Sequence, residues 1–425
     1  MTLTLSRRRF IRWISASAAI AGIAACATTG RASSRRVVVV GGGYGGATAA
    51  KYIRLWSPDI DVTLVERESQ FISCPISNLV LGGSKTTADV TVSYNGLAKY
   101  GVKLVRGDAV AVDVDQRRVR LASGEVLRYD RLVLSPGIDF LLDQVPGLRA
   151  AGALDAIPHA WKAGPQTVQL RRQLESMRDG GVYALCIPRS PYRCPPGPYE
   201  RACQVANYFK KAKPRSKVLI LDANPDVVSK KRLFVAAWNG MYKSMVEYQP
   251  NSELSDVDVK SRTAKLVFGD VRADVLNVVP PHRAGNIAVQ AGLVSANDRW
   301  CGVNWLSAES TVRSGIHVLG DATLSAPAMP KSGHMANQHG KLAAAAIIEL
   351  MHGRQPDPQP VIANTCYSFV DDRNVVHVAS VHSYDAAQKT LVPIKGAGGV
   401  SLHANALEGH YAMAWARNIW ADMLD

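Results

Sequence analysis

The chain has 425 residues, of which 47% are hydrophobic, and it carries a formal net charge of +15 at pH 7. This length exceeds what one hydrophobic core usually supports, so we expect two or three domains. The Lys and Arg residues are scattered without a nucleic-acid motif, the ten histidines show no metal-ligand spacing, and no C-x-x-C-H haem motif occurs. Composition therefore argues against a nucleic-acid-binding protein, a metalloenzyme and a c-type cytochrome.

The segment 1–31 is typical of an export signal. Ser6 to Ile11 reads S-R-R-R-F-I, the twin-arginine pattern, and an apolar stretch follows from Trp13 to Ala25. That stretch is shorter than the about 20 residues that span a bilayer, and no other stretch looks transmembrane. Cleavage would leave a basic chain of charge +10, because the segment 1–31 holds five Arg and no acid. Alternatively, Cys26 ends a lipoprotein-like cleavage box and would tether the chain. We expect a periplasmic protein exported already folded.

A dinucleotide-binding fingerprint follows the signal. The apolar run at residues 36–40 precedes Gly41, Gly43 and Gly46, which match G-x-G-x-x-G before a helix-like stretch. The first glycine makes the turn, the second lets pyrophosphate approach the backbone, and the third lets helix and strand pack closely. A second short apolar run, after that helix-like stretch, ends at Glu66, which is placed to accept a hydrogen bond from a ribose hydroxyl.

A second α/β segment is expected from about residue 150, with buried strands at 181–187 and 217–221 and a helix at 201–211 between them. After the first of these strands the chain reads S-P-Y-R-C-P-P in place of a glycine-rich turn. Prolines have no N–H to donate to phosphate. We therefore expect that the protein neither receives electrons from a pyridine nucleotide nor donates electrons to one.

The strand predicted at residues 316–319 ends in Gly320 and Asp321, as in the late FAD-binding segment of two-dinucleotide-domain flavoproteins. There the aspartate accepts a hydrogen bond from the ribityl chain; the alternative is an aspartate that caps the strand. A helix is predicted at 341–351. After a proline-rich linker, residues 361–425 look like a small β-rich domain that closes with a helix.

The predicted fold class is α/β, a two-dinucleotide-binding-domain flavoprotein similar to the FAD/NAD(P)-linked disulfide reductases, with a small α+β C-terminal domain. The predicted division is a signal peptide at 1–31, the first part of the FAD-binding domain at 32–149, a nested NAD-like domain without a phosphate-binding glycine motif at 150–273, the second part of the FAD-binding domain at 274–354, and a C-terminal interface domain at 355–425.

Four segments resemble the flavoprotein subunit of flavocytochrome c sulfide dehydrogenase, and the resemblance extends over essentially the whole chain after the signal. Related Sox-type flavoproteins share the two cysteine motifs. The segments are residues 193–202 (R-C-P-P-G-P-Y-E-R-A), 217–223 (K-V-L-I-L-D-A), 328–333 (A-M-P-K-S-G) and 364–368 (N-T-C-Y-S).

The resemblance implies that Cys194 and Cys366 form a redox-active disulfide beside the flavin. A hydrosulfide would attack one sulfur, and the released thiolate would pass two electrons to the flavin. From the residues alone, a structural disulfide that joins the nested and C-terminal domains is equally compatible. Glu200 is similar to the family's candidate acid/base, the alternative being a solvated carboxylate at a helix N-terminus.

The resemblance also implies that Cys74 bonds covalently to the 8α carbon of FAD. The Pro75-Ile76 that follows departs from the family pattern, and a buried free thiol is the alternative reading. Lys331 and the segment after it are expected to open a helix toward the flavin pyrimidine, where positive potential stabilises reduced flavin. Cys186, Cys203 and Cys301 are read as packed thiols.

The expected function is that of the periplasmic FAD subunit of a sulfide:cytochrome c oxidoreductase, which oxidises sulfide to zero-valent sulfur or polysulfide. Because the chain has no haem motif, a separate c-type cytochrome is the expected partner. One rival is a sulfide:quinone oxidoreductase, for which the end of the chain, His410 to Asp425, offers only a short, weakly patterned membrane segment. A non-catalytic flavin-containing accessory protein of sulfur oxidation is another.

Overall fold

The computed structural model describes residues 35–425. The predicted export signal and Cys26 lie outside the described residues, and the fold begins with β1 (Arg36–Val40). The four consecutive valines of β1 are buried, as expected for a central parallel strand covered on both faces. Alternate valines join two hydrophobic clusters, one with α2 (Tyr44–Trp56) and α9 (Gly333–Met351), the other with β7 (Arg118–Leu121).

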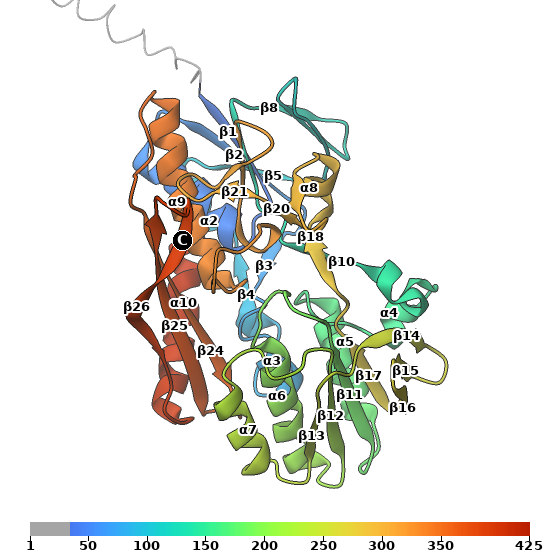
Figure 1. The fold of residues 1–425 in the computed structure, drawn as a ribbon. Helices are drawn as coiled ribbons and strands as arrows, with labels where there is room; N and C mark the ends of the chain where they lie inside the picture. The colour runs from blue at the N-terminus through green and yellow to red at the C-terminus, as the bar shows by residue number, and fades with distance from the viewer. Residues whose placement is uncertain (1–34) are drawn as a thin grey trace, which may run out of the picture. The chain divides into compact units, whose positions relative to one another are not determined.

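This strand is part of a seven-stranded sheet, in which β23, β9, β1, β2 and β5 run parallel. Figure 1 shows α2 and α9 side by side next to it, in agreement with their packing. Across the sheet the strands are β21 (Val303–Asn304), β22 (Glu309–Ser310), β23 (Ile316–Val318), β9 (Arg131–Leu134), β1, β2 (Asp61–Glu66) and β5 (Lys103–Arg106).

A second, all-parallel sheet of four strands is formed by the middle of the chain. Two antiparallel strands, β10 (Ile138–Phe140) and β18 (His282–Ala284), lie where the chain passes between the two sheets, as Figure 1 shows. The second sheet has the order β13 (Val246–Gln249), β12 (Lys217–Asp222), β11 (Val182–Ile187) and β17 (Val275–Val278), and its helices are α5 (Pro165–Ser176), α6 (Gly197–Ala212) and α7 (Lys231–Asn239).

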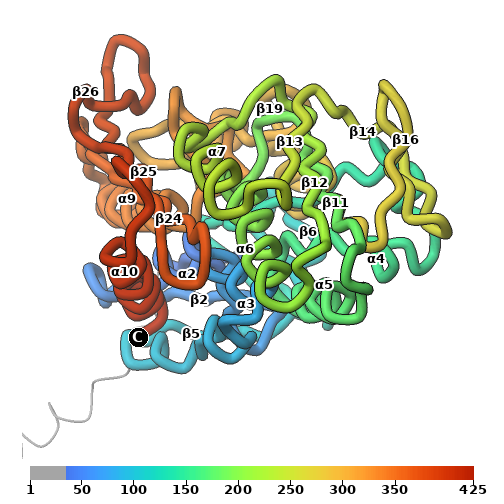
Figure 2. Tube along the Cα trace, turned by 90° about the horizontal axis from the view of Figure 1, so that it is seen from below, coloured from blue at the N-terminus to red at the C-terminus, as the bar shows by residue number. Residues whose placement is uncertain are grey.

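The C-terminal layer is an antiparallel sheet of β24 (Val361–Phe369), β25 (Val375–Asp385) and β26 (Thr390–Val400), followed by α10 (Ala406–Leu424). Strand β24 packs against both α9 and α6, so it lies between the two parallel-sheet regions. Figure 2 shows α10 beside α2, and Lys51 Nζ of α2 donates to the carbonyl of Ala421 at 3.0 Å.

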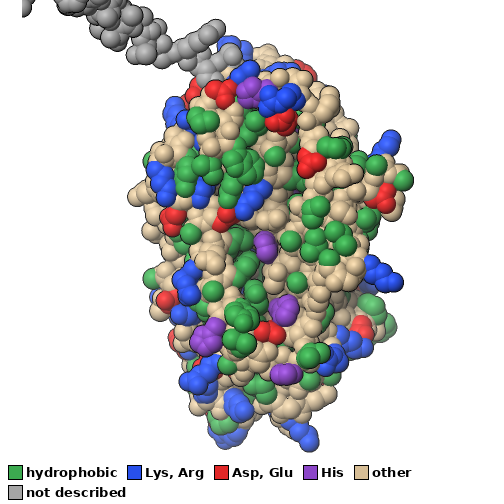
Figure 3. All heavy atoms as spheres, turned by 90° about the vertical axis from the view of Figure 1, so that its left-hand side faces the viewer, with side chains coloured by type: hydrophobic (Ala, Val, Ile, Leu, Met, Phe, Trp, Pro, Cys, Tyr) green, Lys and Arg blue, Asp and Glu red, His purple; other side chains and the backbone are tan. Residues whose placement is uncertain are grey.

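Figure 3 shows that hydrophobic side chains lie among scattered lysines, arginines and histidines on the face at the left of Figure 1. No helix of residues 35–425 is both long and apolar enough to span a bilayer.

The remaining elements are short connections and hairpins. The helical ones are α3 (Asn78–Gly82), α4 (Ala153–Ala156), α8 (Asn286–Gln290) and the 3₁₀ turns η1 (Ala88–Val90), η2 (Asn95–Tyr100), η3 (Leu142–Gln144), η4 (Pro146–Arg149) and η5 (Gly320–Ala322). The strands are β3 (Gln70–Ile72), β4 (Thr91–Ser93), β6 (Ala109–Asp113), β8 (Val126–Arg128), β14 (Leu254–Asp258), β15 (Thr263–Leu266), β16 (Gly269–Arg272), β19 (Val294–Ala296) and β20 (Trp300–Cys301).

Two helices begin earlier than the apolar pattern predicts. Helix α9 starts at Gly333, before the stretch predicted at 341–351 and within the segment after Lys331 that is expected to open a helix; Ser332 caps it, accepting the N–H of Met335 at 3.0 Å. Helix α6 starts at Gly197, with Pro198 in its first turn, where the fixed φ of proline favours helix initiation. Cys194 and Glu200 lie at the N-terminus of α6, and Lys331 lies just before the N-terminus of α9.

Candidate active site

The glycine turn between β1 and α2 leaves space at one of its three positions. A Cβ on Gly41, whose φ is +98°, would lie 2.4 Å from the carbonyl oxygen of Ser135, and one on Gly46 would lie 1.9 Å from that of Gly41. A Cβ on Gly43 would have no neighbour within 4 Å. The first and third glycines are thus required by packing, whereas the second faces open space at the start of α2, where a pyrophosphate fits.

Glu66, at the end of β2, lies beside this turn. Its Oε2 accepts the N–H of Gly42 at 2.6 Å and its Oε1 accepts the N–H of Glu68 at 2.9 Å. Each carboxylate oxygen retains a second lone pair. The structure therefore brings together the glycine turn and the acid that a dinucleotide site requires.

Asp321 lies in η5, directly after β23. Gly320 has a φ of +66°, which favours glycine at this turn. Asp321 Oδ1 is buried and has no hydrogen-bond partner among the described residues, and burial raises the pKa of this carboxyl. Since buried polar atoms are nearly always paired, this oxygen fits a hydroxyl such as those of the ribityl chain. The open Gly43 position, Glu66 and Asp321 together fit FAD.

Lys331 joins the Asp321 turn to the cysteine segment. Its Nζ donates to the carbonyls of Asp321, at 3.0 Å, and Thr323, and lies 3.7 Å from the centre of the Trp300 ring. Burial lowers the pKa of Lys331 to about 8. The carbonyl of Lys331 accepts the N–H of Cys194 at 2.8 Å. A buried cation is thereby held next to both segments.

Cys194 lies in the turn that opens α6. Its φ of +60° is uncommon for a residue with a side chain. A Cβ added to Gly197 would lie 2.9 Å from Cys194 Sγ and 2.9 Å from the Trp161 ring, so glycine is needed there. Burial is the main cause of a raised pKa of the Cys194 thiol, and the nearby charges of Glu200 and Cys366 raise it further.

Cys366 lies on β24, between two polar neighbours on the same face of the strand. Residues two apart on a strand share a face, so Asn364, Cys366 and Ser368 point the same way. Asn364 Nδ2 donates to Cys366 Sγ at 3.4 Å. All six cysteines of residues 35–425 carry free thiols. The structure places Cys194 and Cys366 within electrostatic reach of each other, and their pairing stays a prediction.

Glu200, in the first turn of α6, is buried, so it is not a solvated helix-end carboxylate. Its Oε1 accepts the N–H of Phe369 at 2.9 Å and its Oε2 accepts Asn78 Nδ2 at 2.9 Å. Burial raises its pKa. Glu200 therefore connects α6 to α3 and to the end of β24, in a setting that favours proton exchange.

Cys74 lies near the cysteine turn through Trp161. Its Sγ accepts the N–H of Ala163 at 3.4 Å and lies 3.8 Å from the carbonyl of Trp161. The Trp161 Nε1 in turn donates to the carbonyl of Arg193 at 3.3 Å. Ile76 has a φ of +75°, a strained conformation for a β-branched residue. The unusual sequence after Cys74 thus coincides with unusual backbone geometry.

The second parallel sheet has no free acid at the end of β12, the position that corresponds to Glu66 in the first. Asp222 Oδ2 accepts the hydroxyls of Tyr199 at 2.7 Å and Tyr248 at 3.1 Å. Its Oδ1 accepts both the backbone N–H and the Nδ2 of Asn224. The ribose-binding position of this sheet is therefore engaged by protein groups.

Lys230 is a component of the site that sequence reasoning missed. It precedes two more cations in S-K-K-R, which in sequence is typical of a solvated basic turn. In the structure it is buried, and its Nζ donates to Cys366 O at 2.9 Å and Ser368 Oγ at 2.7 Å. No sequence signal separates Lys230 from its neighbour Lys231.

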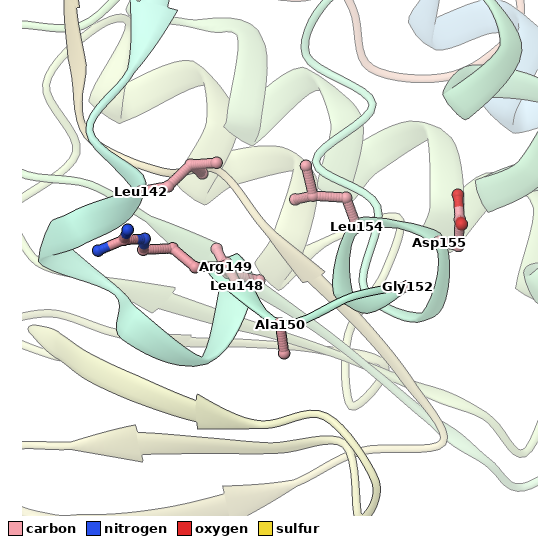
Figure 4. Close-up of a pocket in the computed structure, with 7 residues that line it drawn as sticks. All are labelled: Leu142, Leu148, Arg149, Ala150, Gly152, Leu154 and Asp155. Atoms are coloured by element: carbon pink, nitrogen blue, oxygen red, sulfur yellow. The ribbon is translucent and has the colours of Figure 1, made fainter.

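Two surface pockets lie apart from these residues. One of about 360 Å³, drawn in Figure 4, is lined by Leu142, Leu148, Arg149, Ala150, Gly152, Leu154 and Asp155. The other, of about 530 Å³, is lined by Gly302, Val303, Trp305, Thr311, Leu324, Ser325, Ala326, Pro327 and Thr390. Neither pocket contains a residue that the sequence predicts for the site. The hydrogen bonds and packing contacts described above therefore define the candidate site.

The fold and this site define a two-dinucleotide-domain flavoprotein of the pyridine nucleotide–disulphide oxidoreductase class, whose family model matches residues 35–175. The family model "Sulfide dehydrogenase [flavocytochrome c] flavoprotein chain, central" matches residues 167–280, and "Flavocytochrome c sulphide dehydrogenase, flavin-binding" matches residues 358–424. The chain belongs to the flavoprotein subunits of flavocytochrome c sulfide dehydrogenase, a family of sulfide-oxidising FAD oxidoreductases. The predicted resemblance and fold class are both confirmed.

Individual relatives include a member of this family and a sulfide:quinone oxidoreductase. The chain is 60% identical over 37 residues to the sulfide dehydrogenase [flavocytochrome c] flavoprotein chain of Chlorobaculum thiosulfatiphilum, covering 77% of that sequence and 9% of this one. It is 22% identical over 315 residues to the mitochondrial sulfide:quinone oxidoreductase of Mus musculus, covering 67% of that protein and 70% of this one.

Solved structures share the fold. The sulfide:quinone oxidoreductase of Aquifex aeolicus superposes with a TM-score of 0.72 at 18% identity over 92% of each chain. Putidaredoxin reductase in its covalent complex with putidaredoxin gives a TM-score of 0.66 at 17% identity over 92% of this chain and 96% of that one.

Proposed function

We propose that this protein is the FAD subunit of a periplasmic sulfide dehydrogenase that oxidises sulfide through the Cys194–Cys366 pair and delivers electrons to a c-type cytochrome. The observation that carries the proposal is the continuous set of contacts from Cys194 to the Asp321 turn, where FAD is expected to bind. The Cys194 N–H bonds to the Lys331 carbonyl, and Lys331 Nζ bonds to the carbonyl of Asp321.

The chemistry starts from the disulfide form of the pair. Hydrosulfide attacks one sulfur, a new S–S bond forms, and the bond between the cysteines breaks with its electron pair on the other sulfur. Glu200, buried within electrostatic reach of Cys194 and with a raised pKa, is placed to accept the proton of the resulting persulfide. When bound, FAD supplies the two-electron acceptor. Over the whole cycle hydrosulfide loses its proton and two electrons, which the flavin would accept, the persulfide S–S bond breaks as the disulfide of the pair re-forms, and the sulfur leaves at the zero-valent level or as polysulfide.

The test is anaerobic addition of sulfide to the purified protein while the flavin spectrum is recorded. We expect bleaching in the wild type and none in Cys194→Ser. Cys203→Ala is the matched control because Cys203 is a buried thiol on the same helix α6. A wild-type flavin that does not bleach would reject sulfide as substrate and favour an accessory role.

The electron acceptor requires a separate experiment, because a curated relative and a solved structure of similar fold are sulfide:quinone oxidoreductases. In two separate stopped-flow experiments, sulfide-reduced protein would be mixed with a soluble c-type cytochrome or with a short-chain quinone. Faster reoxidation by the cytochrome is expected. Faster reoxidation by the quinone would replace the cytochrome with a quinone in this proposal.

We further propose export by the twin-arginine route, on the basis of the S-R-R-R-F-I sequence at residues 6–11. Replacing Arg7 and Arg8 together by Lys is expected to retain the flavin-containing protein in the cytoplasm. Fractionation followed by detection of the protein would show this. Periplasmic recovery of the double variant would contradict the route.

A further inference from the structure

Lys230 is a buried cation that the chemistry above does not use. It immediately precedes α7 with a φ of +53°, and its side chain reaches strands β24 and β25. The Nζ donates three hydrogen bonds, all to β24 and β25. Its acceptors are Cys366 O at 2.9 Å, Ser368 Oγ at 2.7 Å and Val376 O at 3.3 Å.

The contacts of Lys230 place its charge at the segment that carries the Cys366 thiol. Ser368 and Cys366 share one face of β24, and the ammonium contacts Ser368 Oγ and the Cys366 carbonyl together. The Asn364 amide also lies against Cys366 Sγ, with Nδ2 at 3.4 Å as a donor and Oδ1 at 3.5 Å as an acceptor for the thiol. The environment of Cys366 therefore contains an amide that can bond the sulfur and a buried cation at the carbonyl of the same residue.

The groups whose negative charge acts on the Lys230 ammonium are thiols and carboxyls. They come from four places in the fold: Cys366 on β24, Glu200 on α6, Cys194 in the turn before α6, and Glu408 on α10. The ring of Phe234 lies 5.9 Å away from Nζ. Burial lowers the pKa of Lys230 to about 8, so the ammonium stays mostly protonated at pH 7.

The surroundings of Cys194 differ. Its side chain packs with the apolar cluster that contains Trp161, and its sulfur faces Gly197. Arg193 and Lys230 also act on the Cys194 thiol, but burial outweighs them and raises its pKa, which disfavours a thiolate there. Lys230 contacts the Cys366 residue directly, through its carbonyl. The two sulfurs therefore lie in unequal environments, although both belong to the same pair.

We propose that Lys230 is a positioning residue that stabilises negative charge on Cys366, so that hydrosulfide attacks Cys194 and Cys366 is the sulfur released as thiolate. This inference rests on the proposed function. In the step, HS⁻ and the disulfide become a Cys194 persulfide and a Cys366 thiolate, which conserves atoms, electrons and charge. A stabilised leaving thiolate departs faster, and Lys230 thereby sets the direction of attack.

The test measures the Cys366 thiol directly, without sulfide. In the full-length flavin-containing protein with Cys194→Ser, alkylation of Cys366 by iodoacetamide would be followed against pH and quantified on the Cys366 peptide. Adding Lys230→Met is expected to raise the pH midpoint by about one unit or more, the effect of removing a close opposite charge. Lys231→Met is the matched control, because Lys231 is exposed and pairs with Asp226.

Lys230→Arg is expected to keep the midpoint near that of the Cys194→Ser parent, since it retains the charge. Equal midpoints in the Lys230→Met and Lys231→Met proteins would overturn the proposal. If Lys230→Met does not fold, Lys230→Gln takes its place, because its amide is polar but uncharged, and a midpoint equal to that of Lys231→Met would again overturn the proposal.

The two proposals fail in different measurements. A wild type that sulfide does not bleach, combined with a Lys230-dependent midpoint, would reject sulfide oxidation and leave the charge assignment intact. Bleaching by sulfide with a midpoint independent of Lys230 would keep the function and reject the role of Lys230.

Discussion

At the scale of single residues, the site combines an acid and a base whose pKa values burial shifts in opposite directions. Burial raises the pKa of Glu200 and lowers the pKa of Lys230 to about 8. Environments that move an acid and a base toward neutrality are characteristic of proton-transfer sites. Cys194 lies within electrostatic reach of both groups and Cys366 within that of Lys230, so the shifted groups surround the sulfurs that the proposed chemistry uses.

Glu200→Gln is expected to slow flavin reduction by sulfide about 100-fold, the lower range for loss of a general acid–base group. Stopped-flow absorbance would measure the rate. In the wild type the rate should rise with pH through a midpoint above the 4.5 of an ordinary glutamate, because burial raises the pKa of Glu200. The Gln variant should lack this rise, and an unchanged profile would assign the proton transfer to another group.

The same shift has a consequence for stability. The folded protein binds the Glu200 proton more tightly than the unfolded chain, so this group's contribution to folding declines as pH rises from the unfolded pKa through the folded one. Denaturation of the wild type and of Glu200→Gln at several pH values should show a difference in unfolding free energy that changes across this window. A difference independent of pH would contradict the raised pKa.

Cys74→Ala tests the covalent attachment that the family resemblance implies. Acid precipitation of the wild type is expected to leave yellow flavin in the protein pellet, whereas the variant should release it to the supernatant. Cys301→Ala, which changes a fully buried thiol, is the control. Flavin in the wild-type supernatant would show that FAD is bound without a thioether, with the strained Ile76 backbone as one physical cause.

At the scale of elements, the segments just before α2, α6 and α9 fix where these three helices start. The glycine turn precedes α2, the Cys-Pro-Pro turn precedes α6, and Ser332 caps α9. Ser332 Oγ also donates to Asn364 Oδ1 at 2.6 Å, which ties α9 to β24 next to Cys366. Helix starts and one strand therefore align the site.

Gly43→Ala and Gly46→Ala are expected to affect different properties, FAD content in the first and fold stability in the second. The Gly43 Cβ would enter open space, so folding should be nearly unchanged while FAD content falls, since the methyl group would stand where pyrophosphate approaches. The Gly46 Cβ would lie 1.9 Å from the Gly41 carbonyl oxygen, and should destabilise the fold by about 1–3 kcal/mol or more. Thermal unfolding and the flavin-to-protein absorbance ratio measure both. Normal FAD content in Gly43→Ala would contradict pyrophosphate binding at this turn.

At the scale of the whole molecule, the seven-stranded and the four-stranded sheet contain parallel strands in the same order, β9-β1-β2-β5 and β17-β11-β12-β13, but differ in binding chemistry. In the first sheet the turn after β1 is glycine-rich and Glu66 retains acceptor capacity. In the second, the turn after β11 contains prolines, and both oxygens of Asp222 are engaged. Strand β24 of the C-terminal layer then supplies Cys366 to the side of the second sheet that carries α6.

NADH and NADPH are therefore expected to leave the flavin oxidised under anaerobic conditions in which sulfide bleaches it. The physical reason is the lack of N–H donors at Pro195, Pro196 and Pro198 together with the occupied Asp222 carboxylate. A flavin spectrum recorded after each addition is sufficient. Rapid bleaching by either nucleotide would mean that a nicotinamide site exists elsewhere in the protein.

By itself, the sequence determined the features that depend on neighbours in the chain. The strand–glycine–helix pattern around Gly41, Gly43 and Gly46, the Gly-Asp turn at residue 321 and the missing glycine turn after β11 all follow from local periodicity and backbone chemistry. The family motifs added Cys194, Cys366 and Glu200 as candidates. The fold class could be predicted because these local patterns occur in the order that a two-dinucleotide-domain chain requires.

Only the tertiary structure decided which charged groups are buried and what they contact. Glu200 meets the end of β24, 169 residues away, and Lys230 meets the Cys366 segment, 136 residues away. Charge and burial at such positions depend on how α6 and the turn before α7 meet β24 and β25, and local sequence contains no record of that packing. A lysine in S-K-K-R is exposed or buried according to the fold around it, so the role proposed for Lys230 required the structure.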